Sequence, residues 1–536
     1  MTSRPPSVVC AGLSFAWPDG RPVLDRLDAA FPPGRTGLVG RNGDGKSTLL
    51  RLIAGELRPS AGTVTPAGSV AYLPQQLPLQ RARTVADLLG IATQRAALAA
   101  ITAGDAAPEH FAAVGDDWDV EPRAVETLAR LGLAARGDDV LDRPVGTLSG
   151  GEAVLCGIAG LLLRRADITL LDEPTNNLDA TARDRLYAAI DSWPGVLIVV
   201  SHDRELLERV DQIAELRDGA TRLFGGPFSL YEDALAAEQE AALRALRAAE
   251  GGLARERRQL VEAQVKLAAR ARVAAKAERE NRVPKIIAHG RRQQAQVSAG
   301  KYRNLHADRV QAARAAVSDA EQAVRDDARI RVDLPATAVP AGRTVLQVGE
   351  LVVRGPERIA LVGPNGAGKT TLLEAVAGRR PHPCAGVGTP AVPTGYLPQR
   401  LDGLDDRHSV LDNVLAGAPR ATAQEIRGRL ARFLVRGAQV DQPAGTLSGG
   451  ERFRVALARL LLADPPPQLL LLDEPTNNLD LASVEQLTAA LAGYRGALIV
   501  ASHDRRFLAG IGVQRVWVVR DLGLPTDDGT GRLPGA

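Results

Sequence analysis

The stretch GRNGDGKST at residues 40–48 decides the fold of this chain, and it returns as GPNGAGKTT at residues 363–371. Each copy fits the pattern GxxxxGK(S/T), in which glycines let backbone N–H groups curl around phosphates at the start of a helix. Apolar LVG residues precede each loop and TLL follows it, as expected of a strand that leads into a helix. The two stretches therefore predict two P-loop nucleotide-binding domains.

Four further motifs occur twice and in the same order. They are YLPQ at 72–75 and 396–399, TLSGGE at 147–152 and 446–451, LLDEPTNNLD at 170–179 and 471–480, and SHDR at 201–204 and 502–505. An ordered series of this kind indicates an internal duplication. The same α/β domain is therefore expected twice, each time around a buried parallel sheet.

The residue types in these motifs suit the binding and hydrolysis of ATP with Mg²⁺. The lysine of each phosphate loop is expected to reach the β- and γ-phosphates, and the hydroxyl after it can ligate Mg²⁺. The Asp-Glu pair after each apolar strand offers a second Mg²⁺ ligand and a general base toward water. These residues are Lys46, Ser47, Asp172 and Glu173 in the first copy and Lys369, Thr370, Asp473 and Glu474 in the second. The alternative for the glutamates is a helix-capping acid before Pro174 or Pro475.

With these five motifs in this order, the chain resembles the ATP-binding cassette superfamily, for which LSGG is the specific signature. The resemblance implies two ATP molecules sandwiched head to tail between the cassettes of a monomer. Each ATP would contact the phosphate loop of one copy and the LSGG of the other. Glu173, Glu474, His202 and His503 would be the catalytic residues, with the two histidines sensing the γ-phosphate.

The resemblance implies a specific set of contacts with ATP and Mg²⁺. In the first copy the ATP-binding residues are Gly40, Asn42, Gly43, Gly45, Lys46, Ser47, Thr48, Gln75, Ser149, Gly150, Gly151 and Asp172. In the second copy they are Gly363, Asn365, Gly366, Gly368, Lys369, Thr370, Thr371, Gln399, Ser448, Gly449, Gly450 and Asp473. The implied Mg²⁺ ligands are Ser47, Gln75, Asp172, Thr370, Gln399 and Asp473.

The two copies differ in ways that predict unequal ATP sites. In this superfamily an aromatic residue before the phosphate loop often stacks on adenine, and Trp17 is placed to do so in the first copy. The second copy has no aromatic residue between Arg303 and Tyr396, so its contact with the base must differ. In the helix after LSGG, the first copy has Leu155 and Gly160 where the second has Arg454 and Arg459.

Composition limits the class of protein without naming its partner. The 536 residues include 45% hydrophobic residues, enough for several cores, and the net charge of +3 is too small to indicate nucleic acid by itself. The three cysteines form no CxxC pair, and no apolar run approaches the ~20 residues of a membrane helix. The N-terminus does not read as a signal peptide. We therefore expect a cytoplasmic protein.

The expected domains are a first cassette at 1–231, a helical hairpin linker at 232–330, a second cassette at 331–521 and a flexible tail at 522–536. The linker is rich in Ala, Arg, Glu and Gln, which favours long helices. Pro284 and Gly290 interrupt this pattern, so we expect two antiparallel helices joined near 283–300.

The tip of this hairpin, at about 275–303, lies in a strongly basic segment. Residues 266–309 contain twelve Lys or Arg and three acids, an excess of +9 against +3 for the whole chain. Such an excess suits phosphate contacts on structured RNA, whereas a solvated coiled-coil face would alternate in sign. The candidate RNA-binding residues are Lys285, Arg291, Arg292, Lys301 and Arg303.

Tandem cassettes with this linker resemble the ABC-F family, whose linker reaches into the ribosome near tRNA. The resemblance implies the ribosome as partner and a translation or antibiotic-resistance role. One alternative is the ATPase subunit of a transporter with a separate membrane chain, although such a subunit needs no basic hairpin. Another is a DNA-acting ABC-F protein, but the final residues lack the basic coiled coil that such members usually carry.

Overall fold

The computed structural model describes residues 7–75, 83–133, 140–176, 178–279, 285–324, 330, 332–399, 403–477 and 479–529. Within these ranges, the side chains of 270–271, 274–275, 277–279 and 285–303 lie outside the description. The chain divides into two compact units. One, Met1–Phe228 with Ala328–Ala536, holds both cassettes, and the other, Ser229–Asp327, is helical.

The first cassette is built on a sheet with strand order β5-β6-β7-β3-β8-β9, parallel except for the β8–β9 pair. Its strands are β3 (Arg35–Val39), β5 (Val70–Leu73), β6 (Ile168–Asp172), β7 (Val196–Val200), β8 (Gln212–Arg217) and β9 (Ala220–Gly225). Every residue of β6 and β7 is buried, which explains their continuous apolar sequence. On β7, Val200 pairs with Asp172 at the end of β6, and the preceding residue, Val199, pairs with Gly37 of β3. The phosphate loop after β3 and the Asp-Glu pair after β6 therefore reach the same edge of the sheet.

A second, antiparallel sheet and a set of helices complete the first cassette. The antiparallel strands, in the order β2-β1-β4, are β1 (Val8–Ala16), β2 (Pro22–Phe31) and β4 (Ala61–Pro66). The helices are α1 (Lys46–Ile53), α2 (Val85–Leu89), α3 (Ala92–Thr102), α4 (Pro108–Val114), α5 (Val120–Arg130), α6 (Gly150–Arg164), α7 (Ala180–Asp191) and α8 (Arg204–Leu207). One apolar core joins the two sheets through α1, whose Leu49 and Leu50 are fully buried. This core fixes the helix that begins at the phosphate loop.

The second cassette repeats this plan with the strand order β13-β14-β15-β12-β16-β17. Its strands are β10 (Thr344–Val348), β11 (Leu351–Arg354), β12 (Arg358–Val362), β13 (Thr394–Leu397), β14 (Leu469–Asp473), β15 (Ala497–Ala501), β16 (Arg515–Val518) and β17 (Thr526–Asp527). Its helices are α11 (Lys369–Val376), α12 (Val410–Leu415), α13 (Ala423–Leu430), α14 (Gly449–Leu461), α15 (Leu481–Ala492) and α16 (Arg505–Gly510). The antiparallel sheet is much shorter here, since β10 and β11 have five and four residues against nine and ten in β1 and β2.

The expectation of a flexible tail from residue 522 is wrong for residues 522–529. Strand β17 pairs antiparallel with β16, and the Arg515 guanidinium bonds to the Asp527 carboxylate at 2.6 Å. The Gly, Pro and Asp residues that suggested fraying instead form a turn that returns the chain to the sheet. Residues 530–536 lie outside the described part of the chain.

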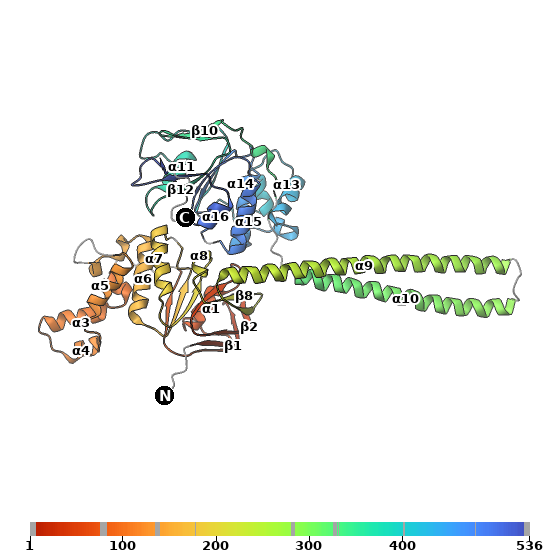
Figure 1. Ribbon diagram of the computed structural model, residues 1–536, viewed down its shortest axis with the longest axis horizontal. Coiled ribbons are helices and arrows are strands. Elements are labelled where there is room, and N and C mark those ends of the chain that lie inside the picture. The colour runs from red at the N-terminus through yellow and green to blue at the C-terminus, as the bar shows by residue number, and fades with distance from the viewer. Residues whose placement is uncertain are drawn as a thin grey trace. The chain divides into compact units, whose positions relative to one another are not determined.

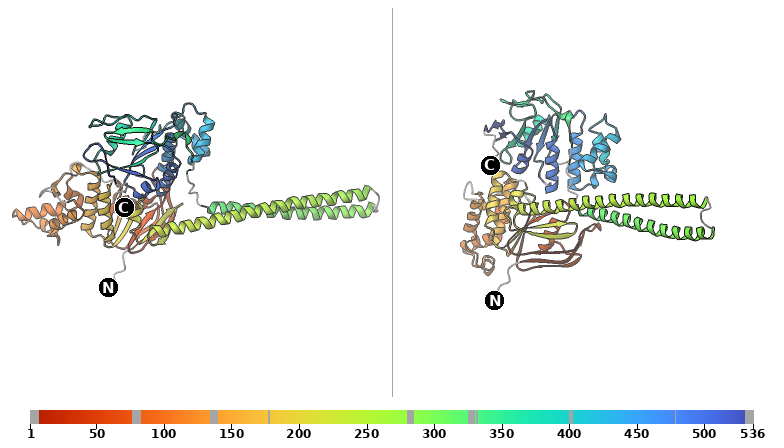
Figure 2. Two further views of the ribbon diagram at one scale, coloured as in Figure 1. Left: turned by 45° about the horizontal axis from the view of Figure 1, so that its top comes forward. Right: turned by 45° about the vertical axis from the view of Figure 1, so that its right-hand side comes forward.

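The helical unit consists of α9 (Phe228–Arg279) and α10 (Lys285–Ala323). Figures 1 and 2 show the two helices side by side and antiparallel, as expected. At 1.5 Å per residue, α9 is about 78 Å long. The predicted interruption at Gly290 is wrong, because α10 continues through it. The predicted interruption at Pro284 lies outside the described residues, between the end of α9 at Arg279 and the start of α10 at Lys285. A glycine costs a helix only about 1 kcal/mol, whereas proline is tolerated only in the first turn.

The predicted fold class, two α/β cassettes joined by a long helical segment, is confirmed.

Candidate functional site

Both phosphate loops use glycine where another residue would not fit. A Cβ atom on Gly40 would lie 2.3 Å from the Leu216 carbonyl oxygen, and one on Gly363 would lie 2.4 Å from that of Val519. Gly45 and Gly368 precede the helices with φ of 95° and 102°, in the left-handed region that favours glycine. The N–H groups that open α1 and α11 are therefore available to an anion.

The two loop lysines are buried and fold back over their own loops. Lys46 Nζ donates to the carbonyls of Gly40 at 2.9 Å and Arg41 at 3.0 Å. Lys369 Nζ donates to Gly363 O at 2.7 Å and lies 3.0 Å from His503 Nε2. Burial lowers the pKa of both lysines, and the acids opposite them oppose that shift. A triphosphate in this place would supply the counter-charge that the buried ammonium groups need.

Most of the residues predicted to hold Mg²⁺ lie together in each cassette. In the first cassette, Ser47 Oγ donates to Asp172 Oδ1 at 3.0 Å and Tyr72 OH donates to Asp172 Oδ2 at 3.2 Å. In the second, Thr370, Gln399 and Asp473 line one cavity of about 300 Å³. Hydroxyl, amide and carboxylate oxygens are the ligands that a hard divalent cation prefers, so the residues fit Mg²⁺. Gln75 is exposed at the end of β5 and is not among the described contacts of Asp172.

The two glutamates lie on a strained backbone. Glu173 and Glu474 have φ of 50° and 44°, which is unfavourable for a residue with a side chain. The backbone N–H of Glu173 donates to Val200 O at 2.9 Å, and that of Glu474 donates to Ala501 O at 2.8 Å. Each strained residue therefore lies where the hydrogen bonds to the neighbouring strand end. Strain of this kind, of order 1–3 kcal/mol, is typical of functional sites. The capping alternative does not describe Glu474, because both of its carboxylate oxygens are buried without a hydrogen-bond partner among the described residues.

Burial prepares both glutamates to exchange a proton near neutral pH. It raises the pKa of Glu173 well above the usual range and that of Glu474 to about 7, while the loop lysine of each cassette opposes the shift. His202 Nε2 lies 3.2 Å from Glu173 Oε1, and His503 Nε2 lies 3.4 Å from Glu474 Oε1. Burial also lowers the pKa of both histidines, which keeps them neutral. A carboxylate with a pKa near the working pH is suited to general-base catalysis.

The LSGG serines begin helices in their own cassettes. Ser149 and Ser448 are the N-caps of α6 and α14, each in a reciprocal pair with the glutamate three residues later. No described contact joins either serine to the opposite phosphate loop, so this pairing stays a prediction. Gly160 has a packing role, because a Cβ atom there would lie 3.0 Å from the backbone of Leu89 in α2.

Trp17 lies at the turn between β1 and β2. Its ring is 37% exposed, packs edge-on against Phe15 at 5.1 Å, and has the Arg51 guanidinium 6.0 Å from its centroid. Arg51 belongs to α1, so the exposed ring is near the helix that begins at the phosphate loop. An accessible indole in this place can stack on a base.

Two aspartates that the motif analysis did not select connect the cassettes. Asp480 Oδ2 accepts from the backbone N–H of Asn42 at 2.9 Å, and Asp179 Oδ2 accepts from that of Asn365 at 3.4 Å. Each aspartate therefore touches the phosphate loop of the other cassette. Both stand at the end of the repeated LLDEPTNNLD, so the repeat itself carried the signal for them.

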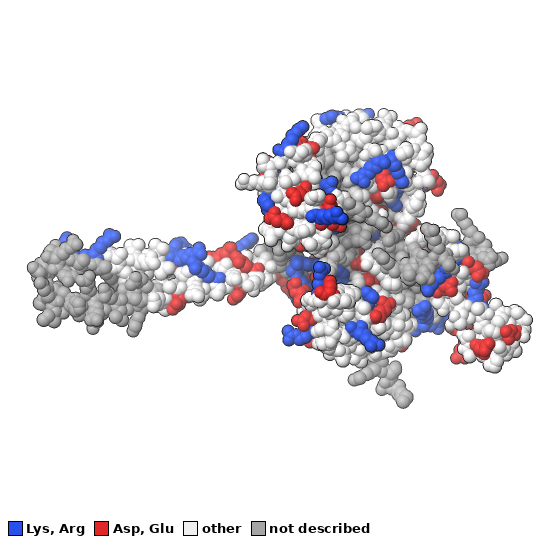
Figure 3. Space-filling view, turned by 180° about the vertical axis from the view of Figure 1, so that it is seen from behind, with Lys and Arg blue, Asp and Glu red and all other residues white. Residues whose placement is uncertain are grey.

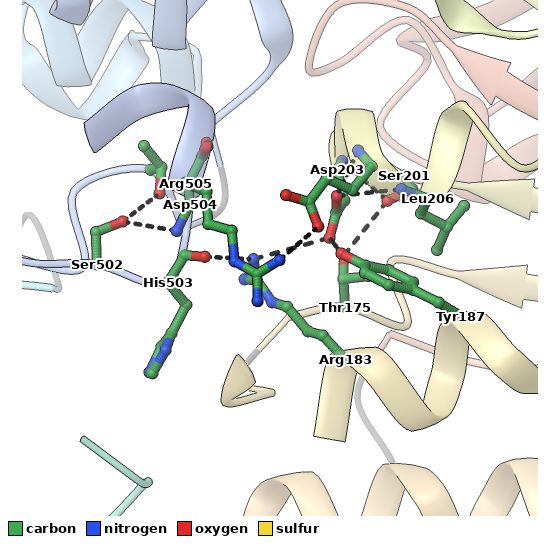
Figure 4. A network of polar contacts seen from close by, with 12 residues as sticks. Thr175, Arg183, Tyr187, Ser201, Asp203, Leu206, Ser502, His503, Asp504 and Arg505 are labelled. Carbon is green, nitrogen blue, oxygen red and sulfur yellow. Dashed lines mark hydrogen bonds and ion pairs between the residues drawn. The ribbon is translucent and has the colours of Figure 1, made fainter. Parts of the chain in front are cut away.

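Arg183 of α7 connects the first cassette to the second (Figure 4). The second cassette has no matching arginine to make the reverse contact. Its Nη1 donates to His503 O at 3.5 Å and lies 3.8 Å from Asp203 Oδ2, which in turn accepts from Tyr187 OH at 2.6 Å. The same position in α15 is Val484. The positive charge of Arg183 also lowers the pKa of Glu474, against the effect of burial. A cation of the first cassette thus acts on Glu474 of the second site, and no repeated motif could have revealed it.

Replacing Arg183 with Gln should impair ATP turnover at the second site more at acidic pH than at alkaline pH. Without the cation the pKa of Glu474 rises, so a smaller fraction of it is ionised below pH 7, and we expect a loss of about two- to fivefold there. Steady-state ATPase profiles from pH 5.5 to 8.5, measured in a Glu173→Gln background, report this site. Arg183→Lys keeps the charge and should keep the profile; a profile that is unchanged in Arg183→Gln would contradict the assignment.

The candidate RNA-binding side chains at Lys285, Arg291, Arg292, Lys301 and Arg303 lie outside the described side chains. The backbone of all five belongs to α10.

Comparison with known proteins agrees with this geometry. The family model described as "ABC transporter" matches residues 24–176 and 347–477, more than half of the chain. The "Tylosin resistance ATP-binding protein TlrC" of Streptomyces fradiae is 35% identical over 525 residues, which cover 91% of this chain and 93% of that protein. The "Probable ATP-binding protein YheS" of Escherichia coli (strain K12) is 32% identical, with 95% and 78% covered. The "Energy-dependent translational throttle protein EttA" of Mycobacterium tuberculosis (strain ATCC 25618 / H37Rv) is 30% identical, with 91% and 87% covered.

A solved structure shows the same fold at lower identity. It is the crystal structure of the complex of archaeal ribosomal stalk protein aP1 and archaeal ribosome recycling factor aABCE1, with a TM-score of 0.54 and 19% identity, covering 97% of this chain and 91% of that one. Among the described helices, none has the length and hydropathy needed to cross a bilayer. The chain therefore belongs to the ABC-F family of ATP-binding cassette proteins, and it is an ATPase that carries both of its cassettes in one polypeptide.

Proposed function

We propose that this protein acts on the ribosome, with the basic hairpin directed at rRNA or tRNA. Two of its relatives bear names that support the proposal, one a tylosin resistance protein and the other a translational throttle. The task is accordingly regulation of translation or protection of the ribosome against an antibiotic. Neither task needs a membrane subunit.

The observation that carries this proposal is the separation of charge along the hairpin. The first part of α9, residues 228–262, contains seven acids and five bases, whereas residues 263–276 contain four bases and no acid. Lys266, Arg272 and Lys276 are exposed, and Figure 3 shows Lys and Arg side chains on this part of the hairpin. An exposed basic segment on a stiff helical pair is suited to binding the phosphates of structured RNA.

The chemistry of the two sites supports a nucleotide cycle for this proposal. In the proposed complex, Ser47 with Asp172, and Thr370 with Asp473, would hold Mg²⁺, aided by Gln75 and Gln399. The ion neutralises phosphate charge when bound. ATP draws the cassettes together, Glu173 and Glu474 accept a proton from the attacking water, and hydrolysis separates the cassettes again. Binding to the ribosome belongs to the closed, ATP-bound form.

Trapping the closed form tests the proposal. The Glu173→Gln, Glu474→Gln protein should co-sediment with 70S ribosomes in a sucrose gradient when ATP is present and remain at the top when ADP replaces it. If the trapped protein stays at the top with ATP, the ribosome is not its partner. Preferential binding to forked DNA would favour a DNA-acting protein, and co-purification with a membrane protein would favour a transporter ATPase.

A further inference from the structure

The second cassette lacks the element that carries Trp17 in the first. Five residues, 17–21, separate β1 from β2, whereas only Gly349 and Glu350 separate β10 from β11. The shorter hairpin has no room for a residue that reaches toward a base, and no aromatic residue is available before Tyr396. The base of the second ATP must therefore meet a different part of the chain.

One matched position in the two phosphate loops identifies that part. The last glycine before the lysine is Gly45 in the first loop and Gly368 in the second. A Cβ atom on Gly45 would lie 2.7 Å from Val23 Cγ1, at the start of β2. A Cβ atom on Gly368 would lie 2.8 Å from Leu522 Cδ2. The turn after β16 thus covers the second loop where the Trp17 hairpin covers the first.

This turn is firmly attached to the phosphate loop. The Leu522 N–H donates to Ala367 O at 2.9 Å, and Cys384 Sγ donates to Leu522 O at 3.6 Å. Leu524 packs on the other side, since Cβ atoms on Gly349 and Gly386 would lie 3.0 and 3.3 Å from its Cδ1. Two hydrogen bonds therefore hold the Leu522 backbone, and the packing of Leu524 holds the same turn.

Two properties of Leu522, its exposure and its backbone conformation, are those expected of a residue that contacts a ligand. Its side chain is 44% exposed although it is apolar. Its backbone is left-handed, with φ of 57°, a conformation that is unfavourable for leucine and typical of functional sites. The corresponding turn of the first cassette passes through Asp218 and Gly219 directly into β9 and has no apolar residue there. The leucine turn is thus specific to the cassette that has lost its aromatic residue.

We infer that Leu522 is the residue against which the base of ATP packs in the second site. An aliphatic side chain offers dispersion contacts to the face of a base but lacks the π-system that makes aromatic stacking strong. The base should accordingly contribute less to the affinity for ATP at the second site than at the first. This inference rests on ATP binding by the second cassette and does not depend on the ribosome as partner.

The experiment compares a ligand with a base and one without it. In the full chain carrying Lys46→Ala, which leaves the second site to bind nucleotide, the dissociation constants of ATP and inorganic tripolyphosphate are measured by calorimetry. Leu522→Ser should weaken ATP binding about 5- to 20-fold and change tripolyphosphate binding by less than twofold, whereas Leu522→Met should change neither. An equal loss for both ligands would show that Leu522 only supports the loop, and no loss would remove it from the site.

Two further variants protect the test against a folding defect. Leu522→Trp should tighten ATP binding several-fold without affecting tripolyphosphate, a gain that misfolding cannot produce. Leu223→Ser on β9, where the leucine is 50% exposed but distant in sequence from either loop, should leave both constants unchanged. If Leu522→Trp does not favour ATP over tripolyphosphate, the inference fails, while the proposal about the ribosome is unaffected.

Discussion

ATP turnover should fall by about 10²- to 10⁴-fold when Glu173 and Glu474 are both replaced by glutamine, the range that a general base contributes. The carboxamide keeps the shape of the side chain and its buried position but cannot accept the proton of the attacking water. Release of phosphate from ATP by the purified protein measures the effect. Binding of ATP should persist, because the phosphate loops and their lysines are untouched.

The two single variants should differ from each other. The Glu474 carboxylate has Arg183 of the other cassette near it, whereas Val484 occupies the equivalent place opposite Glu173. The rate of the wild type should also rise with pH through about 7, as Glu474 loses its proton, and the rise should be absent in the double variant. Equal losses in Glu173→Gln and Glu474→Gln would show that the sites are equivalent.

Replacement of Lys285, Arg291 and Arg292 by alanine should weaken the ATP-dependent association with ribosomes by about 10- to 100-fold at low salt. Each phosphate contact releases counterions, so the slope of log K against log salt should become shallower by about 2 to 3 for three lost contacts. Sedimentation of the trapped protein with ribosomes at several salt concentrations measures both quantities. The basal ATPase should be unchanged, since these residues lie in α10 and not in a cassette.

A matched variant separates the position of the charges from their number. Arg244, Arg247 and Arg255 are exposed on the first part of α9, where acids and bases are mixed, and their replacement by alanine also removes three positive charges. This control should bind ribosomes nearly as well as the wild type. Equal weakening by the two triple variants would mean that net charge, rather than the hairpin tip, attracts the ribosome.

The repeated motifs predicted the fold because they combine local and long-range information. A strand, a glycine loop and a helix in succession fix the backbone around Lys46 and Lys369, and the second copy removes the ambiguity of a single match. Gly290 is a poor marker of an interruption, because the helix around it tolerates one glycine at small cost. The turn residues after Asp521 suggest fraying in sequence, but in the fold they bring Thr526 and Asp527 back to the sheet.

The site was predictable where both copies agree and unpredictable where one copy acts alone. Asp179 and Asp480 belong to a repeated motif and could have been selected. Arg183 and Leu522 have no counterpart in the other cassette, so only the three-dimensional arrangement places them beside His503 and Gly368. Contacts of this kind depend on residues far apart in sequence, and no local pattern encodes them.

Asp179 and Asp480, the aspartates that join the cassettes, each use one carboxylate oxygen within their own cassette and the other toward the opposite cassette. Asp480 accepts from Ser483 N–H at 2.8 Å with Oδ1, which fixes the start of α15, and offers Oδ2 to the other cassette. Asp179 does the same with Ala182 N–H at 2.9 Å. Each carboxylate is therefore held in its docking orientation by its own helix, and little rotamer entropy remains to be lost when the cassettes meet. Preorganisation of this kind lets a small number of contacts hold two large domains together.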